Sequence, residues 1–147
     1  MAGPTRQDTF RVTIQIKDPE NGNLINFGVW DKKSGGAVDS DQYKYKPGGM
    51  QPQISLGGSR TIEDLTISRL YRHERDHVEL QRLINWTGRA TVTVSQHVLD
   101  LDGNVFGSPI VWVGLLKTCT PPAHDSESTD PAMIELVVSP SGDPIVS

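Results

Sequence analysis

A long polar segment, residues 30–60, separates two stretches of sequence that both have the pattern of β-strands. It contains three Gly-Gly pairs, two prolines and many charged residues. Connections in compact domains are usually about 4–6 residues long, and longer ones tend to be functional. A segment this polar buries too little apolar surface to fold alone, yet its apolar residues are spaced as in a hairpin that packs on a surface: Tyr43, Tyr45, Met50, Ile54 and Leu56. We therefore expect an arm, about residues 30–60, that contacts something outside its own domain.

Strand patterns dominate the rest of the chain. Apolar and polar residues alternate strictly in Thr9–Lys17 and in Arg89–Leu99, which is typical of a strand with one face in the core. Asp102-Gly103 predicts a hairpin turn. Three further segments have the composition of strands: Leu24–Trp30, Thr61–Tyr71 and Ala132–Ser139. The sequence predicts one mainly β domain over residues 1–147, a small antiparallel β-barrel or sandwich.

The strand predicted over Pro109–Cys119 is apolar on both faces. One face carries Ile110, Trp112 and Leu116, and the other carries Val111, Val113 and Leu115. An antiparallel strand with water on one side would instead alternate apolar and polar residues. Either a helix or a neighbouring subunit is therefore expected to cover the second face.

One segment, about residues 73–87, has the periodicity of a helix rather than of a strand. Glu74 and Asp76 would lie in its first turn, where the helix dipole favours acids. Gly88 suits the position just beyond its end. Four residues form one stripe of such a helix: His73, His77, Leu80 and Ile84. We expect this to be the only helix of the domain.

Composition narrows the functional classes. The net charge is −4, and lysines and arginines do not cluster, which argues against a nucleic-acid binder. The longest apolar run, Ile110–Leu116, is too short to cross a bilayer, and the N-terminus lacks the apolar stretch of a signal peptide. A single cysteine, Cys119, excludes an internal disulfide and is typical of a reducing compartment. We expect no membrane contact.

Residues 73–77, HERDH, match the HExxH motif of zinc metalloproteases. In that motif two histidines one helical turn apart bind the metal, and the glutamate activates a water molecule. Such a site needs a third protein ligand, but the other histidines are His97, in a predicted strand, and His124, in a loop. We therefore predict no catalytic residue, no metal and no cofactor. The alternative is a small zinc-dependent hydrolase that uses His73, Glu74 and His77.

Three weaker patterns have ordinary explanations. Cys119 has no histidine near it in the sequence, so the pattern does not indicate a nucleophile. LGGSR (Leu56–Arg60) lacks the spacing of a phosphate-binding loop, and its glycines suit a tight turn between arm and strand. Asp100, Asp102 and Asp125 lack the glutamate that completes a calcium loop. Each of the three tryptophans suits the core as well as an interface.

Four sequence segments belong to a similarity that covers most of the chain, from Phe10 to about Ser139. They are GVWDKKSGG (Gly28–Gly36), KYKPGGM (Lys44–Met50), SLGGSRTIEDLTISRLY (Ser55–Tyr71) and TVTVSQHVLDLDGN (Thr91–Asn104). Together they resemble the tail tube (major tail) proteins of bacteriophages. The resemblance implies a small β-barrel or sandwich with one helix, whose copies form six-fold rings that stack into a hollow conduit for DNA. It leaves open whether the tail is contractile.

The resemblance also implies a location and partners. The subunit would belong to the virion tail, assembled in the cytoplasm of the host bacterium. It would bind copies of itself, the tape measure, the tail terminator and baseplate or tip proteins, while DNA passes without specific binding. The inter-subunit and ring-stacking candidates are Trp30, Asp31, Lys32, Lys33, Tyr43, Tyr45, Met50 and Trp112.

One polar strand face would line such a tube. The candidates are the polar residues Arg11, Thr13, Gln15 and Lys17 of the first strand, and the polar set that alternates between Arg89 and His97. Cations on the wall would hold DNA, whereas uncharged hydroxyl groups offer it no fixed attraction. We therefore favour three residues as lumen-facing: Thr91, Thr93 and Ser95.

Overall fold

The computed structural model of the chain describes residues 9–45, 48–49, 54–100, 102–141 and 145–146. These residues form ten strands and one helix. In chain order they are β1 (Phe10–Lys17), β2 (Leu24–Trp30), β3 (Lys32–Gly35), β4 (Val38–Tyr45), β5 (Ile54–Ile62), β6 (Leu65–Leu70), α1 (His73–Trp86), β7 (Thr91–Leu99), β8 (Val105–Thr120), β9 (Met133–Pro140) and β10 (Ile145–Val146). The expected mainly β, antiparallel fold with one helix is confirmed.

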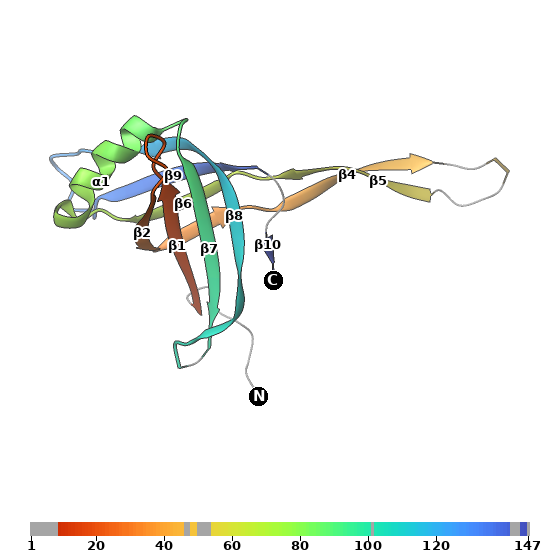
Figure 1. Cartoon of the computed structure of the whole chain (residues 1–147), viewed down its shortest axis with the longest axis horizontal. Coiled ribbons are helices and arrows are strands. Elements are labelled where there is room, and N and C mark those ends of the chain that lie inside the picture. The colour runs from red at the N-terminus through yellow and green to blue at the C-terminus, as the bar shows by residue number, and fades with distance from the viewer. Residues whose placement is uncertain (1–8, 46–47, 50–53, 101, 142–144, 147) are drawn as a thin grey trace.

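The body is a single sheet that folds over on itself (Figure 1). Its strand order is β2-β1-β7-β8-β9-β6-β3, with β10 beside β8. The sixteen-residue strand β8 makes the fold-over possible, because its first part pairs with β7 and its last part pairs with β9. The two edge strands, β2 and β3, follow one another in the chain. Between them, the Asp31 backbone N–H donates to the Ser68 carbonyl oxygen at 3.1 Å, which ties the turn to β6.

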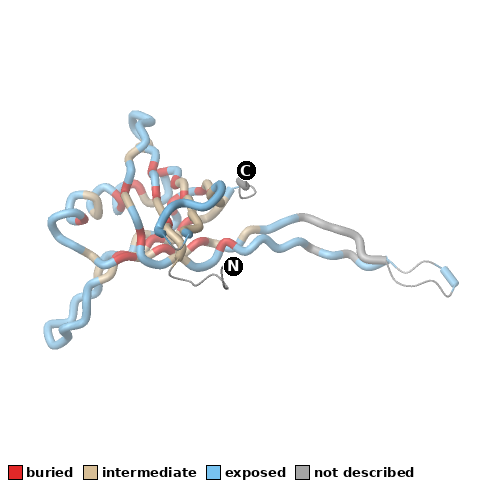
Figure 2. Tube along the Cα trace, turned by 90° about the horizontal axis from the view of Figure 1, so that it is seen from below, coloured by how far each residue is buried: buried red, intermediate tan, exposed pale blue. Residues whose placement is uncertain are grey.

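The core lies between the two halves of this sheet. It is built from the alternating residues that the sequence predicted, including Ile14 and Ile16 of β1 and Val92 and Val94 of β7, all 0% exposed. Figure 2 shows the buried residues concentrated in the body, while the residues of β4 whose burial is described are exposed. The turn between β7 and β8 is also as predicted, since the Asp100 backbone N–H donates to the Asn104 carbonyl oxygen at 2.8 Å.

Helix α1 packs on the end of the sheet, but not with the predicted stripe. Its buried residues are Asp76, Leu83 and Trp86, whereas His73 and His77 are exposed and Ile84 is 51% exposed. Of the four residues of that stripe, Leu80 is the one that packs, partly buried, against the core. The helix is rotated because the Asp76 carboxylate pairs with a buried arginine of β6, Arg69.

The arm is shorter than residues 30–60, because its first residues belong to the body. Strand β3 pairs with β6 from Lys32↔Ser68 to Gly35↔Leu65. The projecting part is the two-stranded ribbon β4–β5, which points away from the body (Figure 1). Gly35 and Gly36 form its base, both with φ above +80°, and a Cβ atom on Gly35 would collide with the Asp64 carbonyl oxygen.

The predicted strand Thr61–Tyr71 is in fact two strands. Residues up to Ile62 belong to β5 of the arm, and β6 starts at Leu65 in the body. The segment Leu56–Arg60 lies inside β5, at an irregularity where Ser40 pairs with Arg60 and Gln42 with Gly57. The expectation of a tight turn there was wrong, because the turn into the body comes after Ile62.

Candidate assembly interface

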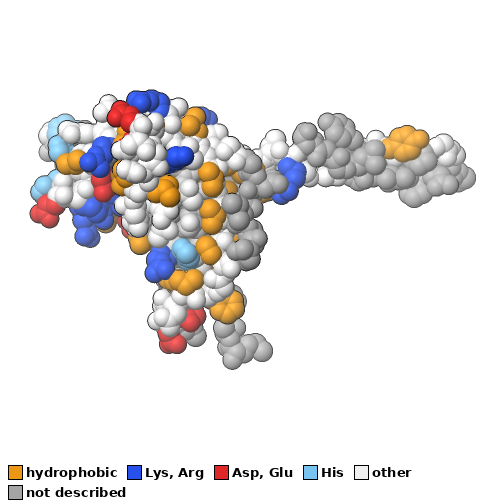
Figure 3. Space-filling view, viewed as in Figure 1, with side chains coloured by type: hydrophobic (Ala, Val, Ile, Leu, Met, Phe, Trp, Pro, Cys, Tyr) orange, Lys and Arg blue, Asp and Glu red, His pale blue; other side chains and the backbone are white. Residues whose placement is uncertain are grey.

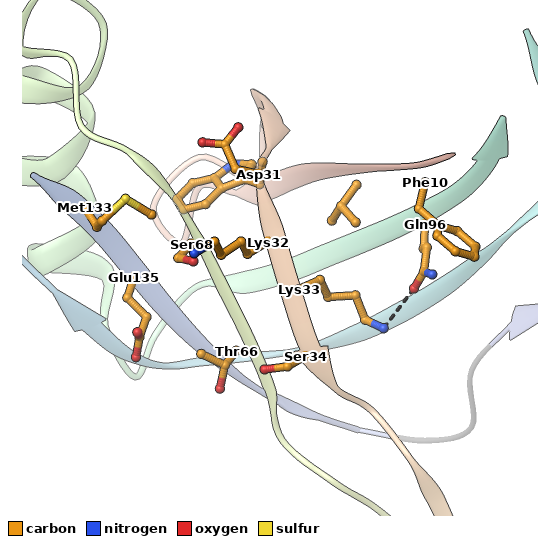
Figure 4. A pocket seen from close by; sticks show the side chains of 12 residues that line it. Phe10, Asp31, Lys32, Lys33, Ser34, Thr66, Ser68, Gln96, Met133 and Glu135 are labelled. Atoms are coloured by element: carbon orange, nitrogen blue, oxygen red, sulfur yellow. Dashed lines mark hydrogen bonds between the residues drawn. The ribbon is translucent and has the colours of Figure 1, made fainter. Parts of the chain in front are cut away.

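A groove of about 920 Å³ runs beside the edge strand β3 (Figure 4). Four of the eight residues proposed from the sequence as inter-subunit contacts line it: Trp30, Asp31, Lys32 and Lys33. The groove borders two strand edges. On one side β1 has no β2 partner at Phe10 and Arg11, because the pairing starts at Val12. On the other side β3 pairs only with β6 among the described strands.

Lys33 is the central cation of this groove. Its register partner in β6 is the buried Ile67, so it lies on the inner face of the sheet. The Lys33 ammonium donates to the Gln96 side-chain oxygen at 2.8 Å and lies 4.3 Å from the centre of the Trp112 ring. Burial lowers the pKa of Lys33. Within the described residues no carboxylate forms an ion pair with Lys33. Its ammonium charge in the groove therefore lacks a counter-ion there.

The two tryptophans proposed as interface residues are core residues in the monomer. Trp30 is 3% exposed and Trp112 is 6% exposed. Each lies under a cation, because Arg69 stacks at 4.3 Å from the Trp30 ring just as Lys33 stacks over Trp112. A neighbour would therefore meet Lys33 before Trp112, and would meet Trp30 only at the groove that it lines, because Arg69 is itself buried.

The remaining interface candidates lie on or near the arm. Tyr45 of β4 is 57% exposed, as expected for a residue without a partner in the monomer. Tyr43 also belongs to β4, although its side chain is outside the described part, and Met50 lies outside the described residues. The register pairs Tyr45 with Ile54 and Tyr43 with Leu56, which places four apolar positions opposite one another.

The two polar sets proposed for a tube wall are not alternatives, because they lie side by side on one face. The β1–β7 register pairs Lys17 with Thr91, Gln15 with Thr93 and Thr13 with Ser95. Opposite residues in an antiparallel pair share a face of the sheet. The hydroxyl-rich face therefore also carries cations at its two ends, Arg11 and Lys17.

The same outward face continues onto β8 as an apolar band. The register places Leu115 beside Thr91, Val113 beside Thr93 and Val111 beside Ser95. Leu115 is 44% exposed. The buried residues of α1, Leu83 and Trp86, belong to the core on the other side of the sheet. Of the two covers expected for this face, the helix therefore does not provide it, and a neighbouring subunit stays a prediction.

The HERDH segment does not build a metal site. The side chains of His73 and Glu74 are 84% and 89% exposed at the start of α1. The Tyr71 hydroxyl lies 3.4 Å from Nδ1 of His77, which is exposed as well. In the part of the chain that the structure describes, no three His, Cys, Asp or Glu side chains converge to hold a metal ion.

The important residue of that segment is Asp76, which sequence reasoning passed over. Its carboxylate pairs with Arg69 and also accepts from the Arg72 backbone N–H at 2.9 Å. Arg69 in turn donates to the Phe27 carbonyl oxygen at 2.6 Å and to Glu79 at 3.0 Å. A signal was present: the alternation Leu65, Ile67, Arg69 places an arginine on the core face, where it needs a carboxylate.

Two other candidate residues have structural roles. Cys119 packs against the core, and burial raises the pKa of its thiol to about 11, so little thiolate forms near neutral pH. Asp100 accepts the backbone N–H groups of Asp102 and Asn104 at 2.9 Å each, which stabilises the hairpin turn. Among the described residues, no helix is long and apolar enough to span a membrane.

No known protein family and no curated protein matches the sequence. Solved structures do match. A chain from the baseplate of the anti-feeding prophage superposes with a TM-score of 0.69 at 14% identity, over 97% of this chain and 95% of that chain. A chain from the sheath–tube complex of the PVC extracellular contractile injection system gives 0.64 at 14% identity, over 95% and 88%. A chain from the sheath/tube terminator structure of that system gives 0.65 at 17% identity, over 96% and 95%.

These values establish a shared fold over almost the whole of both chains. It is the fold predicted from the four tail-tube phrases of the sequence, and it includes the helix and the arm within the matched length. The chain has the fold found in the baseplate, sheath–tube and terminator structures of contractile injection systems.

Proposed function

We propose that this chain is the structural subunit of a phage or phage-like tail tube. In this proposal its copies form rings, six to a ring, and the rings stack into a hollow conduit. The full-length fold match to components of contractile injection systems supports a structural role in a tail assembly. No enzymatic activity, metal or cofactor is part of the proposal.

The observation that carries the proposal is the unpartnered arm. A two-stranded ribbon standing alone is marginally stable in water at best. Strands β4 and β5 pair only with each other within the described residues, and the arm leaves the body without lying on it (Figure 1). A domain that extends such a ribbon gains stability when a neighbouring copy covers the ribbon, which is the geometry of a repeating assembly.

The strand edges supply the contact within a ring. Exposed edges pair readily with other chains. Among the described residues, β1 has no β2 partner at its N-terminal end and β3 pairs only with β6. Joining such edges between copies would continue the sheet around the ring and remove the free edges. A contact that joins two different surfaces of identical subunits closes into a ring when its rotation allows.

The outward face of β1 and β7 is our proposal for the wall of the conduit. Thr91, Thr93 and Ser95 give it hydroxyl groups, and the flanking Arg11 and Lys17 give it a sparse positive charge. The apolar band on β8 that adjoins it, which includes the exposed Leu115, would be covered by the next subunit. DNA would pass along such a wall without specific contacts.

The proposed location is the virion tail, built in the cytoplasm of the host bacterium. The proposed partners, apart from further copies of this chain, are the tape measure, the tail terminator and baseplate or tip proteins. Related folds are present in baseplate, sheath–tube, terminator and cap structures. Electron microscopy and sedimentation of the purified chain test the proposal, with hollow rings or tubes as the expected result and a monomer at every concentration as the contradiction.

A further inference from the structure

The inner face of β1, β7 and β8 continues past the core to residues that are half-buried or exposed. The register pairs Val98 of β7 with both Phe10 of β1 and Phe106 of β8. Residues opposite one another in an antiparallel sheet share a face. Phe10 and Val98 continue the alternation of buried residues on their strands, so this is the core-side face. We call Phe10, Gln96, Val98 and Phe106 the lip.

Three of the four lip residues are apolar, and Phe106 is exposed while Phe10, Gln96 and Val98 are half-buried. Phe106 is 70% exposed, the highest value among the exposed large hydrophobic residues that the structure describes. Hydrophobic side chains also gather on the opposite, outward face of β7 and β8, which is the face seen in Figure 3. An exposed apolar patch of this kind on a soluble domain marks an interaction site.

The lip joins the groove beside β3, and the two share residues. Phe10 and Gln96 line the groove, and Figure 4 shows Lys33 reaching from β3 towards Gln96 near Phe10. Two donors that line the groove lack an acidic or hydrogen-bond partner among the described residues. Lys33 has no carboxylate partner among the described residues, and the buried indole N–H of Trp30, which also lines the groove, has no hydrogen-bond partner there either. An occupant would have to supply both an apolar face and an acceptor, preferably a carboxylate.

The arm of a second copy has both properties. Tyr45 is exposed, and the β4–β5 register sets it opposite Ile54 and Tyr43 opposite Leu56. The base of the same ribbon carries the exposed acid Asp39, which has no ion pair among the described residues. In one copy the arm and the lip extend in different directions (Figure 1), so the arm covers no part of its own lip.

We propose that the lip and the adjoining Lys33 end of the groove are the receptor for the arm of another copy of this chain. This inference rests on the proposed function and names the two surfaces that meet. The aromatic residues of the arm cover Phe10 and Phe106, and a carboxylate of the arm neutralises Lys33. The arm and the lip are different surfaces, so each copy binds one neighbour with its arm and another neighbour with its lip. The contact can therefore repeat along a stack of copies.

Cysteine cross-linking tests the contact directly. Two variants are made on a Cys119→Ala background, one with Tyr45→Cys and one with Phe106→Cys. Equal amounts are mixed, assembled and treated with a short bis-maleimide. The expected product is a covalent heterodimer of the two variants. The matched control replaces Phe106→Cys by Val78→Cys, an exposed apolar position on α1, and is expected to give no heterodimer above the collision background.

A second measurement uses substitution. Phe106→Ser is expected to raise the concentration needed for tube formation about tenfold, because the apolar area of one aromatic side chain is lost from the contact, while Val78→Ser leaves it unchanged. If tubes form but the cross-link is absent and Phe106→Ser assembles normally, the lip is not the receptor and the proposed function stands. If every variant remains monomeric under all conditions, the proposed function fails together with this inference.

Discussion

Arg69 of β6 and Asp76 of α1 form an ion pair whose side chains are 3% and 0% exposed. The pair joins the helix to the sheet, and Arg69 extends it to β2 through the Phe27 carbonyl oxygen. Arg75 also donates to Asp76, at 2.9 Å, from a side chain that is 40% exposed. One carboxylate therefore sets the rotation of the only helix among the described residues.

Replacing that carboxylate is expected to destabilise the body. Asp76→Asn leaves the Arg69 guanidinium buried with only Glu79 as a charged partner, and breaking a buried pair in this way costs about 3 kcal/mol. The double variant Arg69→Met/Asp76→Leu is expected to recover much of this loss, because it buries no charge. Urea unfolding, followed by circular dichroism, measures both.

The control for this stability measurement is a double substitution of the two exposed histidines of the HERDH segment. His73→Ala/His77→Ala is expected to change the free energy of unfolding by less than about 0.5 kcal/mol, as for most exposed positions, and to leave zinc content at background. A loss as large as that of Asp76→Asn, or one equivalent of zinc in the parent protein, would contradict the structural role assigned to this segment.

Asp76 and Glu79 are expected to change the free energy of unfolding in opposite directions as the pH falls. Burial alone would raise the pKa of Asp76, but hydrogen bonds from Arg75 and the Arg72 N–H, and the charge of Arg69, lower it. A lowered pKa gives stability that is present above the ordinary value of about 3.9 and is lost as the pH falls through the folded value. Asp76→Asn should therefore flatten the loss of stability below about pH 4.

Glu79 behaves in the opposite way. Burial raises its pKa against the opposing charge of Arg69, so its contribution is present below the ordinary value of about 4.3 and is lost as the pH rises. Relative to the parent, Glu79→Gln should gain stability as the pH rises from about 4 to 6. Unfolding free energies measured across this range decide the point, and parallel profiles for parent and variant would contradict it.

Removing the arm is expected to leave a folded body that does not form tubes. The deletion is chosen from the strand register, in which Asp39 pairs with Thr61 at the base of the arm. Ser40–Arg60 is replaced by Asn-Gly, a sequence that suits two-residue hairpin turns. A cut from Ser34 to Pro47 would instead remove two pairs of β3 with β6. Urea unfolding measures the fold and electron microscopy the assembly. Normal tubes from the armless chain would refute the role of the arm.

A cationic band on the proposed wall is expected to slow DNA. Thr91→Lys/Thr93→Lys adds two charges per subunit to a face that already carries Lys17 beside Thr91. Tubes should still form, while DNA ejection slows at low salt and recovers at high salt, because phosphate contacts weaken as salt rises. Glu74→Lys, which changes the net charge by the same amount at an exposed helix position, is the control. Equal ejection rates at low salt would place this face outside the conduit.

Much of the fold was predictable because its strands show a simple alternation of apolar and polar residues along the sequence. The buried residues of β1 and β7, such as Ile14 and Val92, follow from period two alone. The turn at Asp100 follows from Asp102-Gly103, a dipeptide that favours hairpin turns. Strand β3 was not predictable in the same way, because KKSG has no strand composition and pairs only because the edge of β6 is next to it.

The candidate site was predictable in part for a related reason. Lys32 and Lys33 were identified from the arm sequence, and the structure places them in one groove. The partners that define the site come from distant elements: Gln96 is 63 residues from Lys33, and Phe106 joins Phe10 only through the register of three strands. The orientation of α1 was missed because one of its three buried residues is Asp76, and the periodicity of apolar residues cannot reveal a buried aspartate.

Electron microscopy of the purified parent chain, with sedimentation over a range of concentrations, tests most directly whether it is a tube subunit. The expected result is hollow rings with six-fold end views that grow into tubes as the concentration rises. The contradicting result is a single species of 16.1 kDa at every concentration, with no rings in the images.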